Sequence, residues 1–256
     1  MKTTLIILLV LTIASIFITG NWNYVSSVVL PNTTWGLYNK DFFENLLVEM
    51  HGGIFELLLV GVILYWFDKR RTKKETKNKA EKTLDYLRFY NGPDASFLFY
   101  GTLRELLSLG VNSVTISNGN LSNLKIKDLN LVYSKLIAVN FSNSTLTNSK
   151  FSDCDLEASQ FVDTKFKNVD LVNVNIQRAK FINSKLNAMN FTKSNIIGTD
   201  FKNSELKSAI FKGVDCSNVS FKGANIRSAN FIGAKNITKE MVMEAKDYRD
   251  IKGISL

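Results

Sequence analysis

Residues 224–233 read ANIRS followed by ANFIG, two copies of one five-residue pattern in which a small residue comes first and a large apolar residue third. Every fifth residue from Leu121 to Phe231 is Leu, Ile or Phe at 22 of 23 positions, and the exception is Cys216. A period of five matches neither an α-helix, which repeats about every 3.6 residues, nor a strand, which repeats every second residue. The pattern therefore predicts a coil that turns one corner in each repeat.

Turn-forming residues stand two positions after many of the large apolar residues. They are Asn143, Asn148, Asp153, Asp163, Asn168, Gly198, Gly213, Gly223 and Gly233. Asn, Asp and Gly accept the strained backbone of tight turns better than other residues do. Small residues such as Ser144 and Ala179 stand two positions before the large ones. We expect the large and the small residues to point inward.

This pattern resembles the pentapeptide-repeat family over about residues 114–235. The resemblance implies a mostly β fold, a right-handed quadrilateral β-helix with four pentapeptides per coil, and residues twenty apart would then stack. One inner ladder would hold Phe141, Phe161, Phe181, Phe201 and Phe221, and the opposite one Phe151, Leu171, Phe191, Phe211 and Phe231. The resemblance is specific for fold and says little about function.

Two apolar runs, residues 5–18 and 54–67, dominate the N-terminal third and can be extended to 3–20 and 42–66. The sequence DKRRTKK follows at residues 68–74, and a basic cluster beside an apolar run marks the cytoplasmic side of a membrane. We therefore expect an α-helical transmembrane hairpin in the inner (plasma) membrane, multi-pass, with the repeat domain cytoplasmic. This arrangement is similar to that of membrane-anchored bacterial members of the family. A cleaved signal peptide at residues 1–20 and a buried core hairpin are the alternatives.

Polar residues interrupt the second apolar run. Glu49, His51 and Glu56 could form a membrane polar patch at a helix–helix contact, because an acidic group in a span usually faces a partner. The alternative places Glu56 at the headgroup level.

The composition divides the chain into four segments. Residues 1–67 would be a two-helix membrane anchor with an outer loop, and residues 68–112 basic juxtamembrane and capping helices. Within the latter, Asp94 would cap a helix over 95–109 that ends at Gly110. Residues 113–236 would be the β-helix and 237–256 a C-terminal capping helix and tail.

Stacking at twenty residues also sorts the outward side chains. One face would collect Lys125, Lys127, Lys165, Lys167, Lys185, Lys207 and Arg227, opposed only by Glu205. A neighbouring part of the rod would show Lys135 against Asp155, Glu157 and Asp215. The seven cations predict a partner-binding surface, and the alternative is a row of lysines that only keeps the rod soluble.

The charge balance favours an acidic partner. The chain carries a formal charge of +9, and residues 113–236 hold 16 Lys and Arg against 9 Asp and Glu. We expect a membrane-anchored scaffold or adaptor that presents the rod to an acidic protein or to anionic lipid. A membrane-perturbing effector that acts through oligomerisation of the anchor is an alternative, and a homo-oligomer is compatible with both.

Nucleic-acid or DNA-enzyme binding is a further alternative and is not favoured. Mimicry of DNA requires an acidic surface, and no aromatic residues alternate with the lysines to stack on bases. Enzymatic activity is not expected, and neither is a cofactor or metal. His51 is the single histidine, and no phosphate-binding loop, nucleophile elbow or CxxC pair is present. The two cysteines, Cys154 and Cys216, would be buried thiols.

Overall fold

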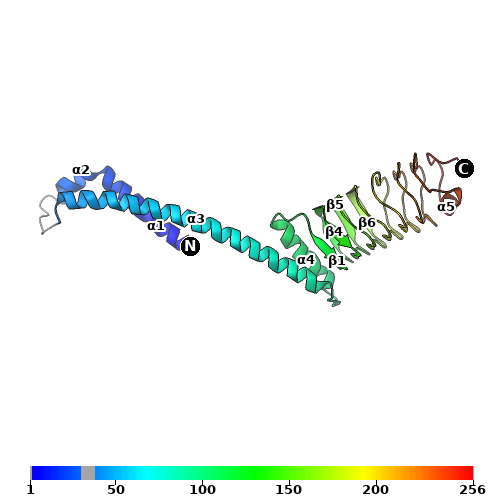
Figure 1. Ribbon diagram of the computed structural model, residues 1–256, viewed down its shortest axis with the longest axis horizontal. Coiled ribbons are helices and arrows are strands. Elements are labelled where there is room, and N and C mark those ends of the chain that lie inside the picture. The colour runs from blue at the N-terminus through cyan, green and yellow to red at the C-terminus, as the bar shows by residue number, and fades with distance from the viewer. Residues whose placement is uncertain (1, 30–37, 256) are drawn as a thin grey trace. The chain divides into compact units, whose positions relative to one another are not determined.

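The computed structural model describes residues 2–29 and 38–255 (Figure 1). The chain divides into two compact units, Met1–Thr76 and Lys77–Leu256. Residues 30–37, which belong to the predicted outer loop, lie outside the described residues.

The N-terminal unit is helical. It holds α1 (Lys2–Gly20), α2 (Trp22–Tyr24), the π-helix η1 (Val25–Val29) and most of α3 (Lys40–Leu87). By length and apolar composition α3 could cross a membrane, and the helices Ile6–Gly20 and Trp22–Val28, bent by 69°, would add a second span if they count as one. The side chains of the apolar part of α3 are largely exposed: no residue of its most apolar 18-residue window is buried.

Helix α3 continues without a break from its apolar part into the basic segment, so the boundary predicted at residues 67 and 68 falls inside one helix. The basic segment is rich in Lys, Glu and Ala, which favour helix, and it contains no Gly or Pro before Gly92. Two ion pairs at i,i+4 spacing support it, Arg71–Glu75 at 2.7 Å and Lys77–Glu81 at 3.6 Å.

Helix α4 (Ala95–Ser108) lies where a capping helix was predicted, and Asp94 is its N-cap residue, but the Asp94 side chain makes no capping hydrogen bond. The Asp94 carboxylate instead accepts a hydrogen bond from the Tyr90 hydroxyl at 2.8 Å. At the other end Gly110 has a φ of 80°, the left-handed conformation expected after a helix.

The buried face of α4 covers the first coil of the repeat. Phe99, Leu103 and Leu106 are fully buried and join one core cluster with Ala80 of α3 and the first repeat residues. Phe99 lies so close to Gly119 that a Cβ there would stand 2.5 Å from the Phe99 ring. The small residue at position 119 therefore makes room for the helix.

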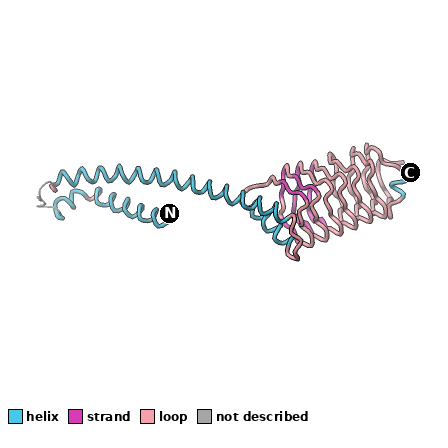
Figure 2. Tube along the Cα trace, turned by 60° about the horizontal axis from the view of Figure 1, so that its bottom comes forward, coloured by secondary structure: helices cyan, strands magenta, loops and turns pink. Residues whose placement is uncertain are grey.

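The repeat region is a stack of parallel coils (Figure 2). The strands are β1 (Thr115–Ser117), β2 (Lys125–Lys127), β3 (Asn130–Val132), β4 (Lys135–Ile137), β5 (Thr145–Ser152) and β6 (Lys165–Val172). In one sheet β1 pairs with β4; in the other β5 pairs with β2, β3 and β6, all in parallel. Every register is offset by twenty residues, and isolated bridges such as Asn175↔Asn195 continue it. The predicted coil of four repeats is confirmed.

Each repeat turns its corner through one residue with a positive φ. These corners occur at every fifth residue from Asn118 to Gly233, in agreement with the predicted turn positions. Most hold Asn, Asp or Gly, which tolerate this backbone, and Gly213 at φ 71° is an example.

The two predicted phenylalanine ladders fill the core. Phe161 stacks on Phe141 at 4.8 Å and on Phe181 at 4.6 Å between ring centroids, with ring planes within 7° of parallel. On the other ladder Phe211 stacks on Phe191 and on Phe231, each at 5.0 Å. The ring spacing matches the ~4.8 Å between hydrogen-bonded strands, so each coil places one ring on the next.

Inward-facing serines hold the backbone of the preceding coil. The buried Ser159 hydroxyl donates to the Leu136 carbonyl at 2.7 Å and accepts from the Val139 N–H at 3.2 Å. Where the later coil has alanine, as at Ala179, the corresponding Ser159 N–H instead closes a turn onto the Leu156 carbonyl at 3.1 Å. The buried N–H groups of Val139 and Ser159 are thus satisfied in different ways, one by a serine of the next coil and the other by a carbonyl of its own coil.

One face of the stack lacks its backbone pairing between two coils. Among the described residues no backbone hydrogen bond joins segment 169–173 to segment 188–193, although the equivalent segments on either side are paired. Val169 and Met189 occupy, on consecutive coils, the inward position that most other repeats fill with Ser, Thr, Ala, Cys or Gly, and a cleft of about 270 Å³ opens beside them. These larger side chains account for the separation.

The C-terminal end differs from the predicted capping helix and tail. Helix α5 (Lys239–Met243) is short, and the Thr238 hydroxyl caps it by accepting from the Met241 N–H. The chain then returns to the coil: the Ile226 N–H donates to the Asp247 carbonyl and the Phe231 N–H to the Lys252 carbonyl, both at 2.8 Å. The register here is 22 residues, because the helix adds two residues to the turn.

Candidate functional site

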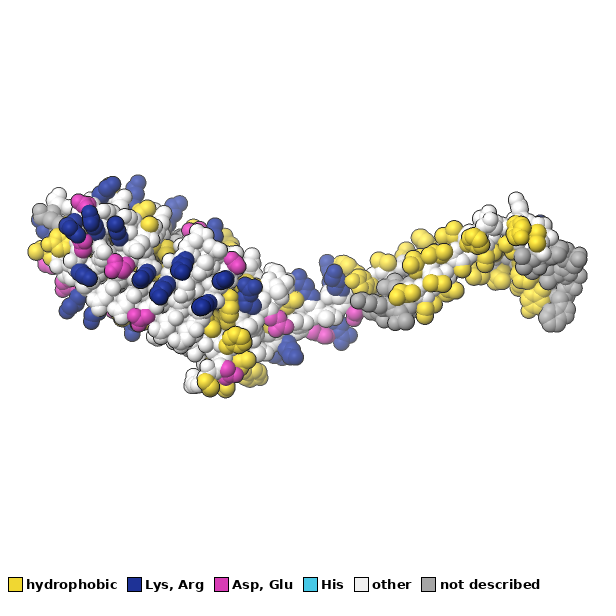
Figure 3. All heavy atoms as spheres, turned by 180° about the vertical axis from the view of Figure 1, so that it is seen from behind, with side chains coloured by type: hydrophobic (Ala, Val, Ile, Leu, Met, Phe, Trp, Pro, Cys, Tyr) yellow, Lys and Arg dark blue, Asp and Glu magenta, His cyan; other side chains and the backbone are white. Residues whose placement is uncertain are grey.

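The predicted cations lie on one face of the coils. Lys125 and Lys127 flank the centre of β2, and Lys165 and Lys167 flank Phe166 at the start of β6. Both strands pair with β5, which has the neutral Thr145 and Thr147 at the equivalent positions. Lys185 is bridged to Lys165 in the next coil. We call this surface, made of Lys125, Lys127, Lys165, Lys167, Lys185 and Lys207, the basic face. Figure 3 shows one side of the repeat region on which Lys and Arg outnumber Asp and Glu.

The lysines of the basic face are free cations. All six side chains are exposed, and within the described part of the chain none forms an ion pair. Coils lie ~4.8 Å apart, so the cations form a file along the stack. Glu205, which is bridged to Lys185, is the one carboxylate at an equivalent position of this face, so the file keeps a net positive charge and can attract an anionic surface.

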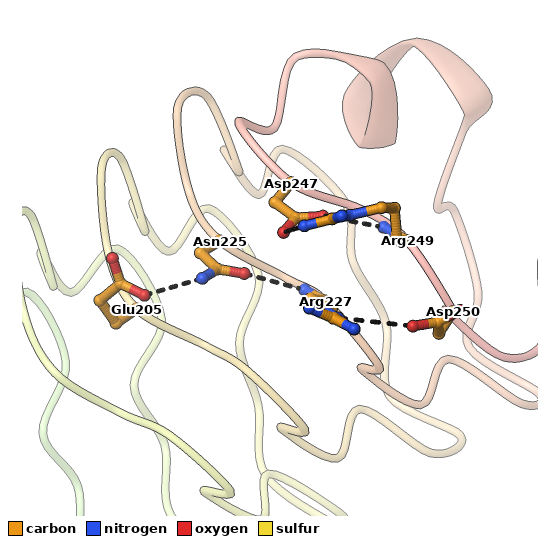
Figure 4. Close-up of polar contacts among 6 residues, drawn as sticks. All are labelled: Glu205, Asn225, Arg227, Asp247, Arg249 and Asp250. Atoms are coloured by element: carbon orange, nitrogen blue, oxygen red, sulfur yellow. Dashed lines mark hydrogen bonds and ion pairs between the residues drawn. The ribbon is translucent and has the colours of Figure 1, made fainter.

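Arg227 differs from the other predicted residues because it already has a partner. Its Nε donates to Asp250 Oδ2 at 3.4 Å, and its side chain is only partly exposed (Figure 4). Its backbone N–H donates to Asn225, whose amide donates to Glu205 at 2.9 Å. Asp250 comes from the segment after α5, which the repeat pattern does not cover. Arg227 therefore closes the C-terminal end of the coil and is not a free cation of the basic face.

A second ion pair lies beside this one. Arg249 donates to both oxygens of Asp247, at 2.9 and 2.7 Å. These side-chain hydrogen bonds, with one from the Arg249 backbone, hold the pKa of Asp247 well below its usual range. The pair is local to the last coil, and backbone hydrogen bonds such as Ile226 N–H to the Asp247 carbonyl at 2.8 Å join this coil to the one that carries Asn225.

Helix α4 adds a cation at the N-terminal end of the basic face. The exposed Arg104 donates through Nη1 to the Lys127 carbonyl at 3.2 Å, and the backbone N–H of Lys127 donates to the Tyr100 hydroxyl at 3.3 Å. Sequence reasoning missed Arg104, because its position depends on how α4 packs on the first coil.

The acidic residues on the other side of the repeat are largely satisfied locally. Glu157 pairs with Arg178. Hydrogen bonds from Ser217 and Asn236 lower the pKa of Asp215. The uncompensated charge of the repeat is thus positive.

The predicted polar patch of the anchor does not form as one cluster. His51 faces α1: its Nδ1 lies 2.7 Å from the Leu47 carbonyl, and the Ser15 and Thr19 hydroxyls lie 3.4 Å from its Nε2. Glu49 and Glu56 are exposed and are seven residues apart, so they share a different face of α3. Sequence reasoning missed Ser15 and Thr19, since their contact depends on the pairing of the helices.

A cleft of about 430 Å³ lies beside His51. Its lining includes Thr19, Trp22 and Glu44, and the Trp22 indole donates to Glu44 at 2.7 Å. Among the described residues no group of three or more His, Cys, Asp or Glu side chains is arranged to hold a metal.

Both cysteines are buried thiols, as predicted. Cys154 takes the inward position that Ser134 holds in the preceding coil, and its Sγ lies 3.4 Å from the Leu131 carbonyl. Burial raises the pKa of Cys154 and raises that of Cys216 to about 12. Neither thiol is suited to act as a nucleophile.

Comparison with known families matches the repeat region only. Residues 110–181 match a family described as "Pentapeptide repeat region", and residues 170–207 and 199–235 match "Pentapeptide repeats (8 copies)". No curated protein matches the chain.

Solved structures with local similarity are pentapeptide repeat proteins. HetL from the cyanobacterium Nostoc, a protein involved in heterocyst differentiation regulation, is 17% identical over 52% of this chain and 68% of its own, with a TM-score of 0.35. Rfr23 from Cyanothece is 14% identical over 48% of this chain and 86% of its own, with a TM-score of 0.26. A thylakoid lumen protein from Arabidopsis thaliana is 21% identical over 52% of this chain and 76% of its own, with a TM-score of 0.21. At these TM-scores the assignment depends on the family matches.

Proposed function

Since residues 110–235 of this chain belong to the pentapeptide-repeat family, whose members are often interaction or scaffold modules, we propose that it is a membrane-anchored, non-enzymatic scaffold. Its apolar helices hold it in the inner membrane as a multi-pass anchor. Its basic face docks an acidic protein in the cytoplasm.

The exposed apolar surface of α3 supports the anchor. A helix that is apolar all round is normally buried in a protein core or in a membrane. In α3 large side chains such as Phe55, Val62 and Leu64 are about 60% exposed. The basic segment that follows at residues 69–74 supports a cytoplasmic position for the repeat.

The single observation that carries the docking surface is the file of six exposed lysines, none in an ion pair among the described residues, on four coils of the same face. The other side of the rod satisfies its charges internally, through Glu157–Arg178 for example. An acidic protein fits this face better than single-stranded nucleic acid does, because the basic face presents no aromatic side chain for base stacking.

The test is affinity purification of the full chain from detergent-solubilised membranes. The variant carries Lys165, Lys167, Lys185 and Lys207 changed to Glu. The matched control reverses four exposed, unpaired lysines on other parts of the coils, Lys193, Lys202, Lys212 and Lys222. We expect an acidic protein to co-purify with the wild type and the control and to be lost from the variant.

Equal thermal unfolding of the three proteins would show that the variant is folded. Identical co-purifying material in all three would contradict the docking role of the basic face. Nuclease-sensitive material lost only from the variant would indicate nucleic acid as the partner instead.

A further inference from the structure

The basic segment of α3 begins directly where the apolar part ends. Residues 68–82 hold eight Lys or Arg (69, 70, 71, 73, 74, 77, 79 and 82) against Asp68, Glu75 and Glu81. Two of these cations are neutralised on the helix itself, Arg71 by Glu75 and Lys77 by Glu81. The remaining cations have no ion pair among the described residues.

Distance along the helix separates the unpaired cations into two groups. A helix rises ~1.5 Å per residue, so Lys69, Arg70, Lys73 and Lys74 lie within about 11 Å of the last apolar residue, Phe67. All four are exposed. Lys79 and Lys82 lie about 18–23 Å along the same helix, more than two screening lengths of ~8 Å away in physiological salt, so their attraction to charges at the end of the apolar part is much weaker.

Arg70 is held at the end of the apolar part by an aromatic ring. Its guanidinium lies over the Trp66 ring at 3.7 Å from the ring centroid. Trp is the residue type that prefers the headgroup region of a bilayer, and a guanidinium stacked on it keeps its N–H groups free for a phosphate. Trp66 and Arg70 thus place an aromatic ring and a cation together at the end of the apolar part of α3.

We propose that Lys69, Arg70, Lys73 and Lys74 bind the phosphate headgroups of anionic phospholipids in the cytoplasmic leaflet. This inference rests on the proposed membrane anchoring and adds a lipid preference to it. Each Lys or Arg close to an anionic membrane surface raises the affinity of its segment for that surface by about five-fold. The four together therefore select anionic lipid around the end of the span.

Trp66 supplies the measurement, because it lies beside Arg70. In the full chain with Trp22 and Trp35 changed to Phe, Trp66 is the single tryptophan. The protein is reconstituted in phosphatidylcholine vesicles to which one of two quenchers is added. The quencher is either phosphatidylglycerol or phosphatidylcholine, and each is brominated high on its acyl chain. We expect brominated phosphatidylglycerol to quench Trp66 emission half-maximally at a mole fraction at least about five-fold lower than the mole fraction of brominated phosphatidylcholine that does so.

A proximal variant and a distal control test the assignment. Changing Lys69, Arg70, Lys73 and Lys74 to Gln should bring the ratio of the two half-maximal mole fractions to one. Changing Lys77, Lys79 and Lys82 to Gln should leave it unchanged. The ratio cancels any direct effect of losing Arg70 on Trp66 emission.

Two results would overturn the proposal, and they differ in what else they overturn. Equal quenching of the wild type by both lipids would keep Trp66 in the bilayer and refute only the lipid preference. No quenching by either lipid would place Trp66 outside the bilayer and refute the anchoring as well.

Discussion

Replacing Ser159 with Ala tests how the inward serines stabilise the coils. Ser159 is fully buried, and its Oγ joins two coils by donating to the Leu136 carbonyl and accepting from the Val139 N–H. The substitution removes one small polar atom and creates almost no cavity. Its main effect is to leave the Val139 N–H without a partner.

The magnitude follows from that orphaned group. A buried donor left unsatisfied costs ~1–3 kcal/mol, so we expect the free energy of unfolding to fall by this amount. At ~2–4 °C per kcal/mol for a domain of this size, the Tm should fall by about 2–12 °C. The measurement is far-UV circular dichroism of the detergent-solubilised chain during heating. Ser142→Ala is the control, because no hydrogen bond of the Ser142 hydroxyl occurs among the described residues.

The result that refutes this reasoning is a loss below ~0.5 kcal/mol, the size of an ordinary surface substitution. It would mean that, in the variant, the Val139 N–H donates to the Leu136 carbonyl and closes a turn within its own coil. The Ser159 N–H already does this with Leu156, opposite Ala179.

Three further predictions concern other parts of unit Lys77–Leu256. Hydrogen exchange should be faster at the amides of Leu171 and Asn190 than at equivalent positions of adjacent coils, because the backbone pairing is missing there; equal protection would contradict the gap. Cys216, whose pKa burial raises to about 12, should not react with a thiol reagent at pH 8 until the protein is unfolded, and a fast reaction in the folded state would show that the site opens. Changing Arg249 to Gln should raise the pKa of Asp247 toward its ordinary value of 3.8, measured by NMR titration, because two side-chain hydrogen bonds to the carboxylate are lost. A carboxyl group with a lowered pKa stabilises the fold above about pH 4 and loses this contribution as pH falls through the folded pKa. In the wild type the C-terminal coil should therefore loosen only in strong acid. An unchanged Asp247 titration in the Arg249 variant would refute the pairing.

The five-residue period predicted which residues of the repeat point inward. The resemblance to the pentapeptide-repeat family added the four repeats per coil, and the two together place Phe161 on Phe141. The corner residues follow in the same way, because only certain residue types tolerate a positive φ. The apolar runs and the basic cluster likewise predicted the helices of the N-terminal unit.

Contacts outside the period depended on the tertiary structure. Asp250 reaches Arg227 only because α5 adds two residues to the last turn, and Arg104 reaches Lys127 only through the packing of α4. His51 meets Ser15 rather than Glu56 because the pairing of α1 with α3 selects one helix face. A repeat specifies its own neighbours at a constant offset, whereas segments without a repeat acquire theirs from packing, which no local pattern encodes.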